Sequence, residues 1–241
     1  MNQFIQKKIF ERLKHSYNPD LNNKKILLLV ATHTNTELKL NTIKKNLQYF
    51  RCSSINILVC NSTNLPFNSE LSSYYNNNNI SYYEIENDNK YDFGKWIYLL
   101  RNINYTLYDF VIFTNDSYII HYPITQFINL TIKNNYELYG YNDSTQYKYH
   151  YQSYLFSIRN DAINKFIGYY RTVKDNLNSQ EDVINMLEIK MIHFFKTKGC
   201  FLNIGLIKIN RGKNIFFTND FLYNKLKSTR LLPFTKIKRI L

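Results

Sequence analysis

KKILLLVAT (residues 24–32) is the stretch that decides the fold. Its apolar run is uninterrupted but far too short to cross a membrane, which is typical of a strand buried on both faces. INILVCN (55–61) repeats this pattern, and DFVIFTND (109–116) repeats it with a polar end. Strands of this kind occur in parallel sheets that carry helices on both sides.

Segments with helical spacing separate these predicted strands. Residues 36–50 and 93–103 place apolar side chains three and four positions apart, the pattern of a helix that packs on one side. A strand is expected at 80–86, and the four asparagines at 76–79 are interpreted as a surface loop. The alternation predicts an α/β fold, a single Rossmann-like domain with a mixed, mostly parallel sheet and helices on both faces.

The second half of the domain continues this alternation. Strands are expected at 137–143, 150–158 and 201–209. Helices are expected at 124–134, from Asn160 or Asp161 to about Tyr170, and at 179–198, with Gly199 as the C-cap. The predicted domain therefore covers residues 24–224.

The two ends of the chain have a different character. Residues 1–23 contain an amphipathic helical pattern, which predicts either a helix docked on the domain or one that lies on a membrane or a partner. Residues 225–241 hold six Lys or Arg and no acid, and form a basic C-terminal tail.

Composition excludes several classes of protein. The three cysteines have unrelated spacings, which argues against a disulfide framework and favours a reducing, cytoplasmic compartment. The charges near the N-terminus do not suit a signal peptide, and no P-loop, GxGxxG or GxSxG motif occurs. The net charge of +13 favours a polyanionic partner, which could be nucleic acid, an anionic membrane or a phosphorylated small molecule.

Polar residues at the predicted strand ends are candidates for ligand binding, because open α/β sheets bind ligands at the carboxyl ends of their strands. Thr32 and His33 follow the first strand. Asn115, Asp116 and Ser117 follow the strand at 109–116, and one carboxylate among oxygen-bearing side chains suits a hard cation that carries a diphosphate. The alternative is that this triplet forms a turn or a helix N-cap.

Two further motifs carry polar groups at useful places. In YDFGKWIYLL (91–100), Gly94 allows a close backbone approach and Asp92 could accept from a ribose hydroxyl or a base; the alternative is a capping Asp92 with Trp96 in the core. His150 and Gln152 alternate along a predicted strand, which suits either a sugar-binding cleft or an edge strand that faces water.

Three carboxylates are candidates for a general base. Glu181 and Asp182 open the predicted helix at 179–198, and Glu188 follows on roughly the same side. Any of them could accept the proton of an acceptor hydroxyl. The alternative is that the first two merely complement the helix dipole and that the third is solvated.

Five segments in a fixed order resemble one known family. They are YDFGKWIYLL (91–100), YDFVIFTNDSYII (108–120) with Pro123 after it, LYGYND (138–143), HYQSYLFSI (150–158) and MLEIKMIHFFKTKG (186–199). Together, over about residues 24–205, they resemble the rhamnan synthesis protein F family, sugar transferases of bacterial and viral polysaccharide assembly. Two departures are His121-Tyr122 in place of Gly before Pro123, and Tyr139-Gly140 in place of Trp-Gly.

The resemblance implies a GT-A-like glycosyltransferase that uses a UDP-, dTDP- or GDP-linked sugar, with rhamnose as one candidate, and a glycan or lipid-linked hydroxyl as acceptor. Asn115, Asp116 and Ser117 would replace the Asp-x-Asp motif, with Asp116 as the ligand of Mn²⁺ or Mg²⁺. The nucleotide would lie against Thr32, His33, Asp92 and Gly94. The sugar or acceptor cleft would hold His150 and Gln152, and the base would be Glu181, Asp182 or Glu188.

A second function from another class remains open at this point. The same fold could be a catalytically idle, basic binding module for nucleic acid or an anionic membrane, because the charge of +13 suits both functions. For the enzyme, we expect a cytoplasmic protein, with peripheral contact to a membrane surface through the two ends of the chain as the alternative location.

Overall fold

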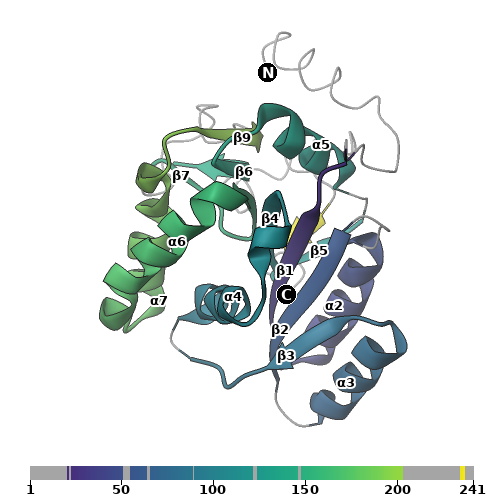
Figure 1. Cartoon of the computed structure of the whole chain (residues 1–241). Coiled ribbons are helices and arrows are strands. Elements are labelled where there is room, and N and C mark those ends of the chain that lie inside the picture. The colour runs from purple at the N-terminus through teal and green to yellow at the C-terminus, as the bar shows by residue number, and fades with distance from the viewer. Residues whose placement is uncertain are drawn as a thin grey trace, which may run out of the picture.

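A computed structural model describes residues 21, 23–50, 55–63, 66–88, 90–121, 124–145, 148–202 and 234–236 (Figure 1). Of the segment 1–23, where a helix is expected, only residues 21 and 23 are described, and most of the basic tail at 225–241 also lies outside the described residues.

One mixed sheet forms the centre of the fold. Its strand order is β3 (Ser81–Glu84), β2 (Ile55–Thr63), β1 (Ile26–Thr34), β4 (Phe110–Asn115), β8 (Leu155–Arg159), β6 (Leu138–Ser144) and β7 (His150–Tyr151), with β9 (Lys198–Leu202) paired to β6. The first four strands are parallel, whereas β8 is antiparallel to both β4 and β6. The predicted α/β fold with a mixed, mostly parallel sheet is confirmed.

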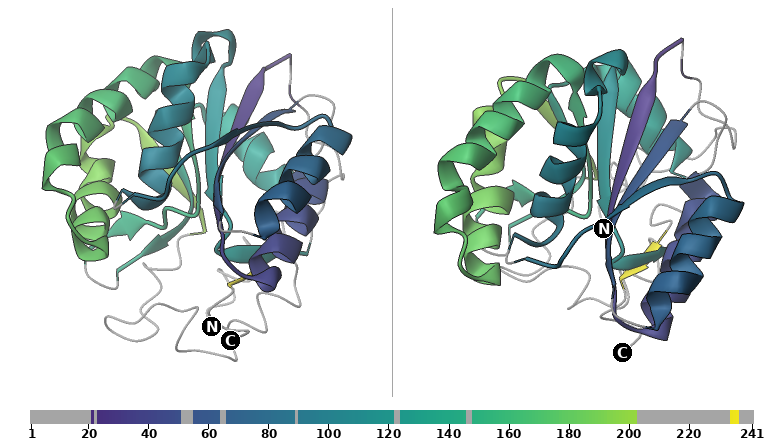
Figure 2. Two further views of the ribbon diagram at one scale, coloured as in Figure 1. Left: turned by 90° about the horizontal axis from the view of Figure 1, so that it is seen from below. Right: turned by 60° about the horizontal axis from the view of Figure 1, so that its bottom comes forward.

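Helices cover both faces of this sheet, as predicted (Figure 2). One face packs against α2 (Glu37–Phe50), α3 (Phe67–Asn77) and α5 (Thr125–Asn134). The other face packs against α4 (Tyr91–Asn102), α6 (Asn160–Val173) and the segment that follows α6. The short helices η1 (Tyr105–Leu107) and η2 (Lys174–Asn176) lie in the connections.

The side chains of β1 explain why its sequence is apolar at every position. Leu28 and Val30 belong to the core under α2, whereas Leu27 and Leu29 belong to the core under α4 and α6.

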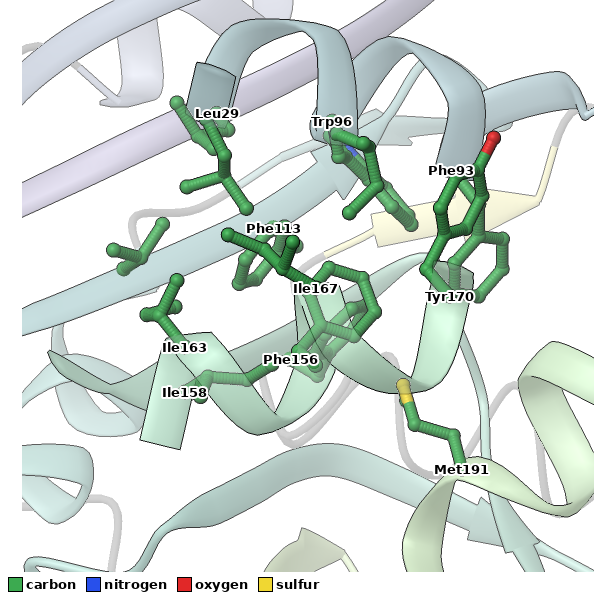
Figure 3. Close-up of a cluster of buried hydrophobic side chains, with 14 of the residues drawn as sticks. Leu29, Phe93, Trp96, Phe113, Phe156, Ile158, Ile163, Ile167, Tyr170 and Met191 are labelled. Atoms are coloured by element: carbon green, nitrogen blue, oxygen red, sulfur yellow. The ribbon is translucent and has the colours of Figure 1, made fainter. Parts of the chain in front are cut away.

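The core under α4 is rich in aromatic rings (Figure 3). Phe113 and Phe156 stack with ring centroids 4.8 Å apart, and Trp96 contacts both rings edge-on. Such pairs add about 0.5–1.5 kcal/mol each beyond the burial of their area.

The stretch before β3 differs from the prediction. Residues 76–79 are predicted to form a surface loop, but α3 runs through Asn77, and only the turn to β3 is irregular. The helix is hard to recognise because only Leu71 and Tyr75 of its residues are buried. Two apolar contacts four positions apart hold a polar helix on the sheet.

The helix predicted at 179–198 is also wrong as a single element. It consists of α7 (Gln180–Val183), the π-helix η3 (Ile184–Ile189) and the 3₁₀-helix η4 (Met191–Phe194). Gly199 is not a C-cap, because it lies in β9 against the ring of Tyr136, where a Cβ atom would collide. Apolar spacing alone does not distinguish the three kinds of helical turn.

Two more strands differ from their predicted bounds. The strand predicted at 150–158 is interrupted by a turn between β7 and β8. That predicted at 201–209 begins earlier, as β9, and its residues after Leu202 lie outside the described part. A small second sheet pairs β5 (Tyr118–Ile120) with β10 (Phe234–Lys236), which belongs to the C-terminal tail. Within the described residues, no helix is long and apolar enough to span a membrane.

Candidate functional site

The candidate site lies where β1 and β4 end. β2 lies on one side of β1 and β4 lies on the other. The connection that leaves β1 therefore runs in one direction, and the connection that leaves β4 starts on the opposite side of β1. Such a divergence leaves a crevice at the carboxyl ends of the strands. Asp116 follows β4, and its Oδ2 accepts a hydrogen bond from the backbone N–H of His33 at 2.8 Å. This contact joins two of the predicted site segments.

Lys39 brings a cation to the same carboxylate. Its Nζ lies 3.5 Å from Asp116 Oδ2 and donates to the backbone carbonyl of His33 at 3.0 Å. Asp116 is only 5% exposed. A buried carboxylate needs such partners, because burial penalises an unpaired charge. Lys39 lies in the first turn of α2 and is not among the site residues predicted from the sequence.

Asp92 is the second carboxylate of the crevice. Its Oδ2 accepts from Asn115 Nδ2 at 2.7 Å. Burial and the neighbouring charge of Asp116 raise the pKa of Asp92 to about 6, against the opposing effect of Lys95. Tyr91, just before it, has a φ of 51°, an unusual backbone conformation for a bulky residue. The raised pKa shows that the carboxylates of Asp92 and Asp116 are close enough to repel each other.

Lys95, one turn further along α4, is a buried cation that sequence reasoning missed. It is 2% exposed, and its Nζ donates to Asn87 Oδ1 at 3.2 Å. Among the described residues, no carboxylate lies within ion-pair distance of it. The only signal in the sequence is a lysine inside the otherwise apolar stretch that follows Gly94.

His33 and Thr32 differ in their accessibility to a ligand. His33 is partly exposed, and its Nδ1 lies 2.9 Å from Ser62 Oγ. Burial, and then the charges of Lys39 and Lys95, lower the pKa of His33, which favours the neutral ring. Thr32 is fully buried, and its hydroxyl donates to Asn61 Oδ1 inside the sheet. His33 is therefore the more accessible of the two.

Three other predicted residues take local structural roles. Ser117 donates from its N–H and its hydroxyl to Asn115 Oδ1, so the predicted turn does form around Asp116. A Cβ atom on Gly94 would meet the Asp88 carboxylate and Lys90 Cβ at 3.0 Å. Gly94 therefore faces the loop that precedes α4.

His150 and Gln152 lie at the same end of the sheet as the crevice between β1 and β4, beside the C-terminal end of β6. His150 pairs with Ser144 and is 2% exposed, so an edge strand that faces water is excluded. Its Nδ1 lies 2.7 Å from the Lys148 carbonyl, and its Nε2 lies 3.3 Å from Gln152 Nε2. Burial lowers the pKa of His150.

The three predicted base candidates are separated by the structure. Glu188 Oε1 accepts from Ser153 Oγ at 2.6 Å. Ser153 lies in the turn between β7 and β8. This turn adjoins β4, because Thr114 Oγ1 donates to the carbonyl of Tyr154, the residue after Ser153, at 3.0 Å. Asp182 instead forms a capping box with Ser179, which lowers the pKa of its carboxyl. Glu181 is exposed in the first turn of α7.

The residues present suit a sparsely liganded divalent cation. No group of three or more His, Cys, Asp or Glu side chains in the described part of the chain could hold a metal by itself. Asp116 and Asp92 are, however, neighbouring carboxylates whose mutual repulsion a cation would relieve. Mg²⁺ commonly takes one or two carboxylates and completes its shell with phosphate oxygens and water.

Sequence comparison finds limited similarity to known proteins. No family model matches the chain. The curated relative "Virulence protein VirA" of Vibrio anguillarum is 33% identical over 123 residues, which cover 48% of this chain and 39% of that protein. The match thus spans well under half the length of the relative. Membership of the rhamnan synthesis protein F family stays a prediction.

Three solved structures superpose on much of the chain. The 4-diphosphocytidyl-2C-methyl-D-erythritol synthase of Anaerococcus prevotii has a TM-score of 0.49 at 8% identity, over 83% of this chain and 99% of its own. S. aureus TarS 1-349 in complex with UDP has 0.49 at 10%, over 73% and 57%. Mannosyltransferase PcManGT from Pyrobaculum calidifontis in complex with GDP-Man and Mn²⁺ has 0.46 at 9%, over 68% and 53%. Values this low assign no activity to this chain.

Proposed function

We propose that this chain is a glycosyltransferase that moves a sugar from a nucleotide-diphosphate donor to an acceptor hydroxyl. One observation carries the proposal. Asp116 contacts His33 across the crevice between β1 and β4, beside the Lys39 ammonium. A carboxylate and a cation at this point of an open α/β sheet suit a nucleotide whose phosphates carry the negative charge.

The donor would lie along the carboxyl ends of β1 and β4. Lys39 and Lys95 would offset the charge that develops on the diphosphate as the glycosidic bond breaks. His33 would contact the nucleoside. A divalent cation held by Asp116 and Asp92 would, when bound, add further charge stabilisation to the leaving phosphate.

The acceptor would approach from the side of β6 and β7, where His150 and Gln152 lie. Its oxygen forms the new bond to the anomeric carbon, and the old bond to the phosphate oxygen breaks. We assign the base role to Glu188, which would take the hydroxyl proton, because Ser153 holds its carboxylate near the end of β4. Asp182 uses its carboxylate to cap α7, and Glu181 lacks such a position at the edge of the sheet.

The resemblance described above suggests where to begin the search for substrates. Rhamnose would be the first donor sugar to test, and a glycan or lipid-linked hydroxyl the first acceptor. A cytoplasmic location belongs to the same proposal, since nucleotide sugars would then be at hand.

A panel of UDP-, dTDP- and GDP-sugars, each with and without Mn²⁺ or Mg²⁺, tests this function by thermal shift and calorimetry. A ligand at 100 times its Kd adds about 2.7 kcal/mol of stability. We expect one nucleotide to stabilise the wild type and Asp116→Asn to lose that effect while it stays folded, because Asn can still accept from His33. Asp175→Asn, at an exposed carboxylate, is the matched control.

Failure of every nucleotide in this panel would contradict the proposal. Salt-sensitive binding to nucleic acid or anionic vesicles, unchanged by Asp116→Asn, would instead support the basic binding module.

A further inference from the structure

A hollow lies at the opposite end of the sheet from the candidate site. It has a volume of about 1040 Å³ and is lined by the start of β2, the turn between α3 and β3, and the segment between α4 and β4. Leu27 lines it, and His33 lies six positions further along the same strand, a distance of about 20 Å. A ligand in this hollow would therefore not occupy the donor crevice.

The strand register explains why the hollow exists. β3 begins opposite Leu58, so the first three residues of β2, Ile55 to Ile57, extend beyond the end of β3. The turn at 76–80 and the segment at 103–108 form the walls of the resulting notch. The hollow is thus a consequence of the strand pairing and not of a missing side chain.

The described part of the lining is unusual because it carries no charge. Its described residues include five Asn and four Tyr but no Lys, Arg, His, Asp or Glu, although one residue in five of the whole chain is charged. Asn and Tyr are common throughout this chain, so their number alone means little. The absence of charge among the described lining residues is the informative feature, in a protein with a net charge of +13.

The polar groups of the hollow combine donors, acceptors and ring faces. Asn56 Nδ2 donates to Tyr108 Oη at 2.7 Å, which orients both groups on one wall. The side chains of Asn76 and Asn79 are exposed on the opposite turn. Leu107, which is 61% exposed, supplies apolar surface beside them. Amides and phenols both donate and accept, as sugar hydroxyls do, and rings and aliphatic side chains cover the C–H faces of sugars.

We propose that this hollow is a binding site for a neutral saccharide, separate from the donor crevice. A phosphorylated or acidic ligand would require a cation in the lining, and a lipid chain would leave the amides unpaired. The volume of about 1040 Å³ lies just above the roughly 300–1,000 Å³ found for small-molecule sites, so the hollow could hold more than one sugar ring. The site does not depend on catalysis, although it would suit an enzyme that extends a glycan.

Calorimetric titration of the whole chain with neutral oligosaccharides of glucose, mannose and rhamnose tests this proposal. Heparin-derived oligosaccharides are the charged counterpart. Asn56→Asp places a charge in the lining, and Tyr108→Phe removes only the phenolic oxygen. We expect a neutral oligosaccharide to bind and each of these variants to weaken binding by about tenfold. Asn176→Asp, at an exposed position on η2, should bind like the wild type.

The outcomes separate this site from the proposed function. Saccharide binding that persists in Asp116→Asn, while the nucleotide effect is lost, supports two separate sites. The proposal is overturned if no neutral oligosaccharide binds, if only heparin fragments bind, or if Asn56→Asp and Tyr108→Phe both bind like the wild type. Unchanged melting temperatures for these variants would exclude unfolding as the cause of a loss.

Discussion

At the scale of single residues, Lys95 is the clearest sign of function. Lys95 is 2% exposed, and its ammonium donates to the neutral Asn87 side chain. A buried cation without a carboxylate costs stability, and replacement of buried charge by apolar groups of similar size is often neutral or stabilising. The site therefore retains a charge that the fold does not need, as expected where an anion binds.

This reasoning gives the first prediction. Lys95→Met should keep the free energy of unfolding or raise it by about 1–2 kcal/mol, and should weaken nucleotide binding by about tenfold or more. Urea denaturation and calorimetry measure the two effects. Lys45→Met, at an exposed position of α2, is the control. A strongly destabilised variant with intact nucleotide binding would give Lys95 a purely structural role.

At the scale of secondary-structure elements, Asn46 fastens α2 to β5. Its Nδ2 donates to the Tyr118 carbonyl at 2.7 Å, and its Oδ1 accepts from Ile120 N–H at 2.8 Å. The residue is 1% exposed. An amide thus satisfies two backbone groups of a short strand that begins two residues after Asp116, so the conformation of the site loop depends on this contact.

The second prediction concerns this contact. Asn46→Ala should lower the free energy of unfolding by about 2–4 kcal/mol, because it leaves two buried backbone groups unpaired. Asn41→Ala, on the exposed side of the same helix, should change it by less than about 0.5 kcal/mol. Chemical denaturation compares the two variants. Equal effects would show that Asn46 is not a specific connection between α2 and β5.

At the scale of the whole molecule, Glu137 connects three distant parts of the chain. Its Oε1 accepts from Lys165 on α6 at 2.5 Å, and its Oε2 accepts from the Lys196 N–H before β9 at 2.6 Å. Burial acts to raise the pKa of Glu137, but the hydrogen bond from Lys165 and the other contacts outweigh it, so the pKa lies below the usual value of 4.5. The ionised form is therefore favoured in the folded protein.

The third prediction follows from the sign of this shift. Because the pKa of Glu137 is lower in the folded protein than its usual value, the ionised carboxylate stabilises the fold at pH values above about 4.5. This contribution to the free energy of unfolding disappears as the pH falls through the folded-state pKa. Glu137→Gln should cost about 1–3 kcal/mol at pH 7, and this difference from the wild type should shrink below about pH 4.5. Denaturation at several pH values measures the difference, with the exposed Glu181→Gln as control. If the difference in free energy of unfolding does not vary with pH, the ionised Glu137 carboxylate is not the source of this stabilisation.

Much of the fold follows from the amino-acid sequence itself. The apolar strands β1, β2 and β4 and the helices α2 and α4 are predictable, because burial on two faces or on one helical face leaves a periodic pattern. The same pattern places His33 and Asp116 at strand ends. The polar helix α3 and the π-helix η3 are not predictable in this way, because two apolar contacts or a change in hydrogen-bond spacing leave no clear period.

Only the tertiary structure decides which polar groups meet. The crevice exists because β1 lies between β2 and β4, a pairing that depends on the whole sheet. Lys39, Lys95 and Asp92 join Asp116 there because two helices approach the ends of these strands from opposite faces. The hollow beside Asn56 likewise results from the register of β2 and β3. Contacts between residues far apart in the chain depend on packing, and local sequence patterns do not encode packing.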